Sequence, residues 1–267
     1  MREKKNFYII MLISALFISC GKKVDKNPLG GIDPSDRGER DDRVSDDSSI
    51  RQFISEQGLT CLDEQDCPAN IAKLVIIDRQ RVSFCTGTLI GSDTILTSSS
   101  CLPRSLRVPG LNCKNSIFAI FPKTYSKPVE RIGCSKIISS DSNEIDDPAL
   151  LSSDFAFIKL KEKVSRTTSF VSRRGLNVKS KYNAVKVNYV DDYMGEVAKK
   201  KCSPLLNSFA NPFTTSKYSP MVTVSECGFL EGNAGAPVFN SKGFIVGLFS
   251  SKMDKKVRVR FAPSPTG

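Results

Sequence analysis

Short apolar segments recur along the chain, and they constrain its fold more than any other feature of the sequence. The segments are rich in β-branched residues and are bounded by Gly, Asp, Ser, Asn or Pro, which is typical of strands separated by turns. Helical periodicity is scarce, and 191–199 is the one fair short candidate for a helix. We therefore predict an all-β sandwich or a pair of barrels. The predicted strands cover residues 72–77, 83–90, 94–97, 116–121, 155–160, 185–190, 222–224, 237–239 and 244–249.

The 267 residues include no histidine. This absence excludes a Ser-His-Asp triad, a Cys-His dyad and every zinc site that needs imidazole. Hydrophobic residues make up 40% of the chain, which excludes global disorder and provides for a packed core. The cysteines contain no C-x-x-C pair, so we expect no metal, and nothing in the sequence indicates a cofactor.

The first twenty residues are typical of an export signal. Basic residues at the start precede a twelve-residue apolar run, 7–18. A helix of that length spans about 18 Å, less than the roughly 30 Å of a hydrocarbon core, so a signal peptide is favoured over a permanent span. Ser19-Cys20-Gly21 resembles a bacterial lipobox, which predicts lipidation of Cys20; the alternative is an ordinary cleaved signal with an incidental cysteine.

Polar segments follow the signal and end the chain. Residues 21–55 are rich in Gly, Asp and Ser, and we expect a disordered tether that holds a folded domain, 56–251, away from a membrane. Residues 252–267 are predicted to be a basic tail. A basic run, 159–186, could bind an anionic surface, although such a run is more often a solvated connector. No nucleic-acid motif accompanies it, and no nucleic-acid partner is expected.

Nine cysteines leave eight after Cys20, and an exported protein normally pairs them. Eight cysteines allow 105 pairings, so counting alone does not decide. Local spacing suggests Cys61–Cys67, Cys85–Cys101, Cys113–Cys134 and Cys202–Cys227.

Three segments, in order, resemble the chymotrypsin-like and trypsin-like serine proteases. F-C-T-G-T-L-I at 84–90 with T-I-L-T-S-S-S-C at 94–101 is similar to the family's C-x-G-T-L-I and V-L-T-A-A-H-C. D-F-A-F-I-K-L at 154–160 is similar to its D-I-A-L-I-K-L. G-N-A-G-A-P-V-F at 232–239 resembles G-N-S-G-S-P-V-F of the glutamyl-endopeptidase branch, which also often has a cysteine seven residues before the nucleophile, as Cys227 stands here.

The resemblance implies two antiparallel six-stranded β-barrels, about 68–165 and 166–251, with a cleft between them. It bridges Cys85 to Cys101 and places Ser100, Asp154 and Ala234 at the three triad positions. Ala234 has no nucleophilic oxygen and Ser100 cannot act as a base, so the triad is degenerate. The buried Asp154 then needs another role, either contacting a ligand or accepting a hydrogen bond from the Ser100 hydroxyl or local backbone.

The backbone N–H groups around Gly232, Asn233 and Ala234 remain as oxyanion-hole donors for a peptide. Asn233 carries no charge to pair with a newly cut N-terminus, so we expect folding without activation cleavage. The sequence thus predicts an inactive protease homologue, a pseudoenzyme, that is lipid-anchored in a bacterial cell envelope, on the periplasmic face or the outer membrane, and binds a peptide or protein. The alternatives are an active serine endopeptidase and a structural lipoprotein without a ligand.

The tail carries a second resemblance. V-R-V-R-F-A-P-S-P-T-G at 257–267 is similar to the start of glutamyl-tRNA synthetases, but the chain stops before that family's histidine-containing motif. Aminoacylation does not follow, and we interpret 253–267 as a fused segment or an accidentally similar tail.

Overall fold

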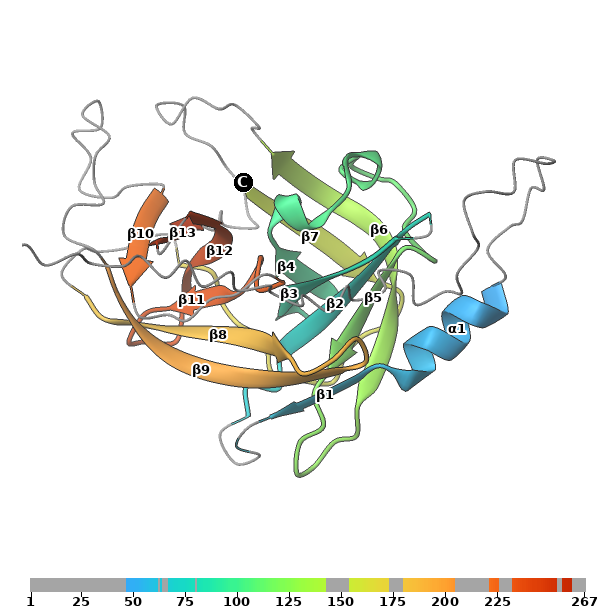
Figure 1. Ribbon diagram of the computed structural model, residues 1–267, viewed down its shortest axis with the longest axis horizontal. Coiled ribbons are helices and arrows are strands. Elements are labelled where there is room, and N and C mark those ends of the chain that lie inside the picture. The colour runs from blue at the N-terminus through green and yellow to red at the C-terminus, as the bar shows by residue number, and fades with distance from the viewer. Residues whose placement is uncertain are drawn as a thin grey trace, which may run out of the picture.

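The computed structural model describes residues 47–61, 63, 67–79, 81–142, 154–172, 180–204, 221–225, 232–253 and 256–260. Strands dominate these residues, as predicted, and one α-helix precedes them (Figure 1). The strands form a closed antiparallel barrel and a second sheet, in agreement with the predicted double-barrel class. Cys20 and Cys227 lie outside the described residues. Among the residues described, no helix has the length and apolar character that a bilayer crossing requires.

Six antiparallel strands close the first barrel in the order β2-β3-β4-β7-β6-β5. Two short 3-10 helices, η1 (Ser99–Cys101) and η2 (Arg104–Leu106), follow β4. The strands are β2 (Ile71–Asp78), β3 (Arg81–Gly91), β4 (Thr94–Thr97), β5 (Ile117–Phe121), β6 (Glu130–Ser142) and β7 (Asp154–Leu160).

The second sheet has seven strands in the order β1-β9-β10-β13-β12-β11-β8. The last strand of this order, β8, also pairs with β9. The six strands from β9 to β8 therefore follow one another in a ring, and β1 is attached in parallel to β9 outside that ring. The strands are β1 (Gly58–Cys61), β8 (Tyr182–Tyr189), β9 (Met194–Pro204), β10 (Met221–Ser225), β11 (Pro237–Phe239), β12 (Ile245–Met253) and β13 (Lys256–Arg260).

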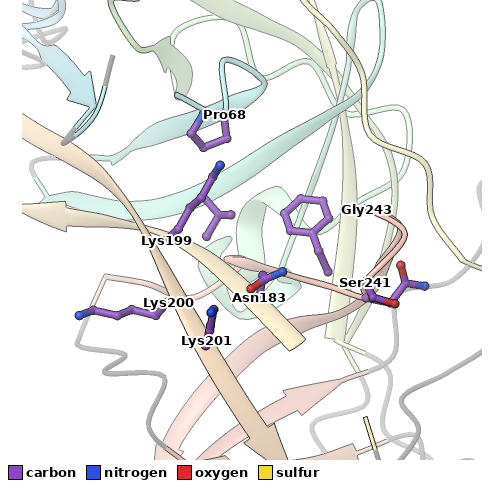
Figure 2. A pocket seen from close by; sticks show the side chains of 10 residues that line it. Pro68, Asn183, Lys199, Lys200, Lys201, Ser241 and Gly243 are labelled. Carbon is purple, nitrogen blue, oxygen red and sulfur yellow. The ribbon is translucent and has the colours of Figure 1, made fainter. Parts of the chain in front are cut away.

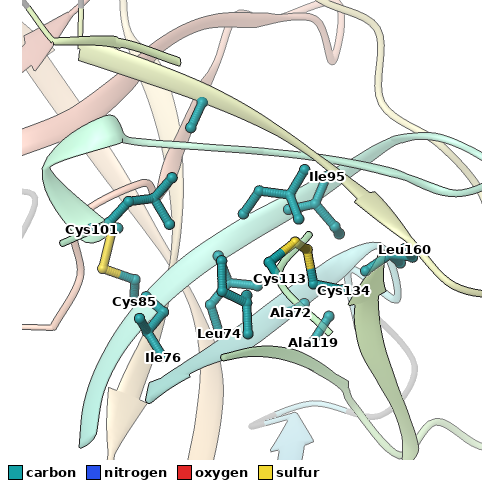
Figure 3. Close-up of a cluster of buried hydrophobic side chains, with 14 of the residues drawn as sticks. Ala72, Leu74, Ile76, Cys85, Ile95, Cys101, Cys113, Ala119, Cys134 and Leu160 are labelled. Carbon is teal, nitrogen blue, oxygen red and sulfur yellow. A yellow bond between two sulfur atoms is a disulfide. The ribbon is translucent and has the colours of Figure 1, made fainter. Parts of the chain in front are cut away.

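Strand β2 is buried on both faces and joins the two halves. Leu74 and Ile76 lie in the core of the first barrel (Figure 3). Val75 and Ile77 lie in a second apolar cluster, with residues of β8, β9 and the helix. A strand with both faces buried reads as a continuous apolar run rather than an alternating one, which is the pattern of I-A-K-L-V-I-I-D.

Three of the four predicted disulfides are seen in full: Cys61–Cys67, Cys85–Cys101 and Cys113–Cys134. The last two cross the core of the first barrel (Figure 3). Cys202 is also disulfide-bonded, and its predicted partner lies outside the described residues.

The predicted tether is wrong at its C-terminal end. Residues Asp47–Glu56 form α1, whose Ile50, Phe53 and Ile54 are buried in the second apolar cluster. These three side chains are spaced by three and four residues, so they share one helix face and bury it although the segment is polar on average. The folded part of the chain therefore begins by residue 47 rather than 56.

The predicted tail is wrong in the same way at the other end. Residues 252–253 end β12 and residues 256–260 form β13, which pairs with both β12 and β10. The alternating K-V-R-V-R pattern therefore forms a strand of the second sheet and not a separate appendage.

The helix predicted over 191–199 is also wrong, because this segment forms the turn of the β8–β9 hairpin and the first part of its second strand, β9. The Asp191 carboxylate accepts hydrogen bonds from the Tyr193 and Met194 N–H groups, at 2.7 and 2.6 Å, and β9 then pairs with β8. Local aspartate turns of this kind compete with helix formation.

Within the basic run 159–186, the basic residues that the structure describes lie in different environments. Lys159 contacts Asp93 at 3.3 Å, and Lys186 is buried. The Arg166 side chain is buried; it contacts Glu130 at 2.7 Å and donates to the carbonyls of Ala69, Pro122 and Pro128. Arg166 thus fastens the segment after β7 to the first barrel.

Candidate functional site

The register of β4 with β7 places the predicted Asp154 beside the Ser98–Ser100 segment. Thr97 pairs with Ala156, so Asp154, two residues earlier on β7, comes opposite the residues that follow β4. The chain turns there into η1, and the Cys85–Cys101 disulfide fastens η1 to β3. Asp154 is 3% exposed, and its carboxylate therefore needs hydrogen-bond donors.

Three successive serines supply those donors. Ser98 Oγ and Ser99 Oγ donate to the two carboxylate oxygens of Asp154, at 2.5 and 2.7 Å. The Ser100 N–H donates at 2.8 Å, and its hydroxyl lies 3.2 Å from Oδ2. Ser98 Oγ and Ser100 Oγ lie 2.6 Å apart. The two Ser100 contacts are those that the second interpretation of Asp154 describes, and the Ser98 and Ser99 hydroxyls are additional donors.

The roles of Ser98 and Ser99 were not predicted. Both side chains are fully buried, where the resembling motif T-A-A-H-C has two alanines. The signal was present in the sequence, because hydroxyls in place of both alanines occur together with the loss of the histidine. The two hydroxyls donate hydrogen bonds to the carboxylate oxygens that would accept one from the imidazole of a triad histidine.

The predicted Ala234 lies in a tight loop before β11. Gly232 and Gly235 have φ values of 85° and 82°, in the region that favours glycine. A Cβ at Gly235 would lie 2.2 Å from both the Thr86 carbonyl oxygen and Thr97 Oγ1. The loop is therefore pressed against β3 and β4, beside the Ser98 segment.

Two side chains hold this loop on the second sheet. The buried Asn233 donates from Nδ2 to the Val187 carbonyl on β8. The Tyr189 hydroxyl donates to the carbonyl oxygens of Cys85 and Gly232, at 3.0 and 3.1 Å. Burial raises the pKa of Tyr189, which keeps the phenol neutral and able to donate.

The structure brings residues 100, 154 and 234, the three predicted triad positions, close together. The Ala234 carbonyl accepts from Thr86 N at 2.9 Å and lies 3.4 Å from the Cys101 sulfur, next to Ser100 in sequence. Position 234 has only a methyl group, and position 100 has an exposed hydroxyl. A carboxylate with a pKa near 4 is a poor base for a serine hydroxyl, whose pKa is many units higher.

The loop also carries two backbone N–H groups that bear on binding, those of Gly232 and Ala234. Within the described residues, neither the Gly232 nor the Ala234 N–H donates a hydrogen bond. Two such donors in one loop are suited to a carbonyl or carboxylate oxygen.

Lys73 is a second buried charge that the sequence analysis missed. It lies on β2, is fully buried, and its Nζ donates to the Tyr193 carbonyl at 3.0 Å. The ammonium lies 4.5 Å from the Phe84 ring centroid and 5.5 Å from that of Tyr189. Desolvation lowers the pKa of Lys73 to about 8, although the carboxylates of Asp191 and Asp192 act in the opposite direction. A lysine inside an apolar strand was the available signal.

Comparison with known proteins agrees with this architecture. The profile of a family described as "Trypsin-like peptidase domain" matches residues 85–248, more than half of the chain. The chain therefore belongs to the trypsin-like peptidase domain family.

Two solved structures illustrate the shared fold. "Structure of GrC" has a TM-score of 0.54 and 16% identity, covering 76% of this chain and 92% of that one. The VesB protease of Vibrio cholerae has a TM-score of 0.53 and 15% identity, and the match covers 76% of this chain and 63% of VesB. At these identities the likeness concerns the fold alone. No sequence among the curated proteins matches this chain.

Proposed function

We propose that this protein is a catalytically inactive trypsin-like domain that binds a peptide or protein at the bacterial cell envelope. The observation that carries the proposal is the Asp154 carboxylate, which is hydrogen-bonded by Ser98, Ser99 and Ser100 in a chain without histidine. With neither a nucleophilic oxygen at Ala234 nor a base, acyl transfer has no starting step. Loss of either group alone typically lowers kcat by about 10⁶.

The Gly232–Ala234 loop supports the binding part of the proposal. Its N–H groups are suited to a peptide carbonyl, and Asn233 and Tyr189 fix the loop from the second sheet. A site that keeps oxyanion donors without a nucleophile holds a peptide and releases it unchanged. The G-N-A-G-A-P-V-F segment further favours descent from the glutamyl-endopeptidase branch.

Lipid attachment is the second part of the proposal. It is supported by the basic start, the short apolar run and the Ser19-Cys20-Gly21 sequence. Metabolic labelling with a radioactive fatty acid should mark the natural chain and not a Cys20→Ser variant. Equal labelling of the two would contradict the assignment of Cys20. Firm retention at a membrane requires more than one acyl chain.

A fluorophosphonate probe tests inactivity, because it reacts only with an activated serine oxygen. The natural chain should remain unlabelled, and no peptide or ester should be hydrolysed at any pH. The structure sharpens the positive control, because restoring His and Ser alone leaves Ser98 and Ser99 on Asp154. The quadruple variant Ser98→Ala/Ser99→Ala/Ser100→His/Ala234→Ser should therefore label more strongly than Ser100→His/Ala234→Ser. Labelling of the natural chain at Ser100, abolished by Asp154→Asn, would restore the endopeptidase interpretation.

Peptide binding is tested by library capture on the exported Cys20→Ser chain. Ala234→Tyr places a large side chain beside the loop N–H groups and should abolish capture. Val108→Tyr is the matched control, since Val108 is an exposed apolar residue of the first barrel, and it should change nothing. If no peptide is captured in a way that depends on Ala234, the structural lipoprotein without a ligand becomes the better interpretation.

A further inference from the structure

A groove of about 590 Å³ lies at the seam between the two halves of the molecule, and none of the triad positions lines it. Pro68 forms one wall, and Lys199 points toward it from β9 (Figure 2). The other lining residues come from β8, β9, the end of β11 and the turn between β11 and β12: Asn183, Val185, Lys200, Lys201, Phe239, Asn240, Ser241 and Gly243.

The groove is distinct from the degenerate site. Tyr189 reaches the Gly232 loop from the end of β8, whereas Asn183 lines the groove near the start of the same strand. Six residues of extended strand separate them, which corresponds to about 20 Å. A ligand in the groove would therefore use a separate surface.

Positive charge gathers at this groove. Lys199 pairs with Val185 and Lys201 pairs with Asn183, so both lysines share the face of the hairpin that lines the groove. Lys200 lies between them in the sequence, and none of the ten described residues that line the groove is acidic.

The groove also offers apolar surface and a fixed wall. Val185 is buried and Phe239 is partly buried in the apolar clusters beneath it. The wall turn is closed by hydrogen bonds from Asn240 N to the Phe244 carbonyl and from Gly243 N to the Asn240 carbonyl, both 3.0 Å. The ring of Phe244, 38% exposed, packs 6.5 Å from that of Phe170, 67% exposed. This exposed aromatic pair therefore adjoins Gly243, one of the residues that line the groove.

We infer that this groove binds an acidic peptide segment that carries a large apolar side chain. Carboxylates would meet the Lys199 and Lys201 ammonium groups, and the apolar side chain would pack on Phe239 or on the Phe170–Phe244 pair. The concave shape favours a peptide over a flat bilayer, which cannot follow the surface down to Phe239. This inference does not rest on the state of the triad.

Fluorescence anisotropy on the full-length exported chain tests it, with a short labelled peptide of alternating glutamate and leucine as the probe. Lys199→Gln/Lys200→Gln/Lys201→Gln should raise its Kd at least about tenfold, because charge-assisted contacts are lost. Lys114→Gln/Lys123→Gln/Lys136→Gln removes the same charge from exposed positions of the first barrel and should leave the Kd within about twofold, since distant surface charges are screened by salt. Ala234→Tyr should also leave it unchanged.

The control peptides and polyanions decide between alternatives. A peptide of alternating glutamate and serine should bind more weakly, because it lacks the apolar side chains. An equal loss of peptide affinity in the two triple-lysine variants would mean general attraction to a basic protein. No loss of affinity in either variant would mean that the peptide binds at another site. Both results overturn the inference. Anionic vesicles or single-stranded DNA that bind through Lys199–Lys201 when the peptide does not would overturn it as well.

Discussion

Two buried charges beside the candidate site, Asp154 and Lys73, are accommodated in opposite ways. Asp154 receives donors from residues adjacent in sequence, Ser98 to Ser100, which β4 delivers as a unit. Lys73 has carbonyl oxygens of the β8–β9 turn, which is distant in sequence, and two aromatic faces. The carboxylate is surrounded by hydrogen-bond donors, whereas the ammonium is mainly desolvated, and its pKa falls to about 8.

The comparison extends to a third group, the Thr88 hydroxyl. It is fully buried on β3, and its Oγ1 has no hydrogen-bond partner within the described part of the chain. Asp154, Lys73 and Thr88 thus form a series of decreasing polar satisfaction in one half of the molecule. Net stabilisation by a buried polar group depends on its partners. Removing the polar partners or groups along this series should therefore change the free energy of unfolding in opposite directions at its two ends, with a loss at Asp154 and a gain at Thr88.

The largest effect is expected at Asp154. Ser98→Ala/Ser99→Ala removes two hydroxyls from a buried carboxylate, and hydrogen bonds to charged groups contribute about 1.5–3 kcal/mol each. Urea unfolding should show a loss of about 4 kcal/mol in the free energy of unfolding. In an Asp154→Ala background, adding the same two serine changes should lower the free energy of unfolding by at least about 2 kcal/mol less than in the natural chain, because the buried charge is gone. Additive effects in this cycle would contradict the serine–aspartate coupling.

Lys73 should make stability depend on pH. Its pKa is about 8 in the folded chain against an ordinary 10.5, so between these values the unfolded chain binds a proton that the folded chain lacks. The free energy of unfolding should therefore rise with pH from about 8 to 10, by up to about 3 kcal/mol. Above about pH 10 the free energy of unfolding should fall. The raised pKa of Tyr189 keeps its phenol proton bound in the folded chain, whereas the unfolded chain releases it.

The measurement is chemical denaturation at a series of pH values. Lys73→Met keeps the length of the side chain and should flatten the rise, whereas Lys123→Met, at an exposed position of the first barrel, should leave it intact. A rise that persists in Lys73→Met would assign the pH dependence to another group.

The smallest effect is expected at Thr88. Thr88→Val keeps the shape and removes a hydroxyl that lacks a partner, so the free energy of unfolding should increase by about 1 kcal/mol. Thr97→Val is the matched control, because Thr97 Oγ1 donates to the Thr86 carbonyl at 2.8 Å, and it should be destabilising by a similar amount. Calorimetry should show that the two substitutions shift the melting temperature in opposite directions. A shift in the same direction would contradict the place of Thr88 at the unsatisfied end of the series.

Much of the fold followed from the sequence because strand segments carry local signals. Apolar runs between turn residues predicted five of the six strands of the first barrel and missed β6, and cysteine spacing suggested the pairs later seen at Cys61–Cys67, Cys85–Cys101 and Cys113–Cys134. The degenerate triad was equally local, since the identity of position 234 and the absence of histidine are read directly from the residues.

Errors arose where a segment gains its structure from distant partners. The polar α1 segment is helical in the structure with Ile50, Phe53 and Ile54 buried against β2, β8 and β9. Residues 256–260 form a strand because β10 and β12 flank them. Segment 191–199 forms a hairpin with β8 rather than a helix. Marginal local preferences of this kind are overridden by tertiary packing.

The sequence by itself determined that this chain has strands, locally spaced cysteine pairs and no histidine, because these depend on residue identity and short-range pattern. Only the tertiary structure decided that Ser98 and Ser99 bond to Asp154, that Lys73 is buried between Phe84 and Tyr189, and that Lys199–Lys201 face Pro68 across a groove. Each of these joins residues tens of positions apart or more, and the pairing register that unites them is set by packing over the whole sheet.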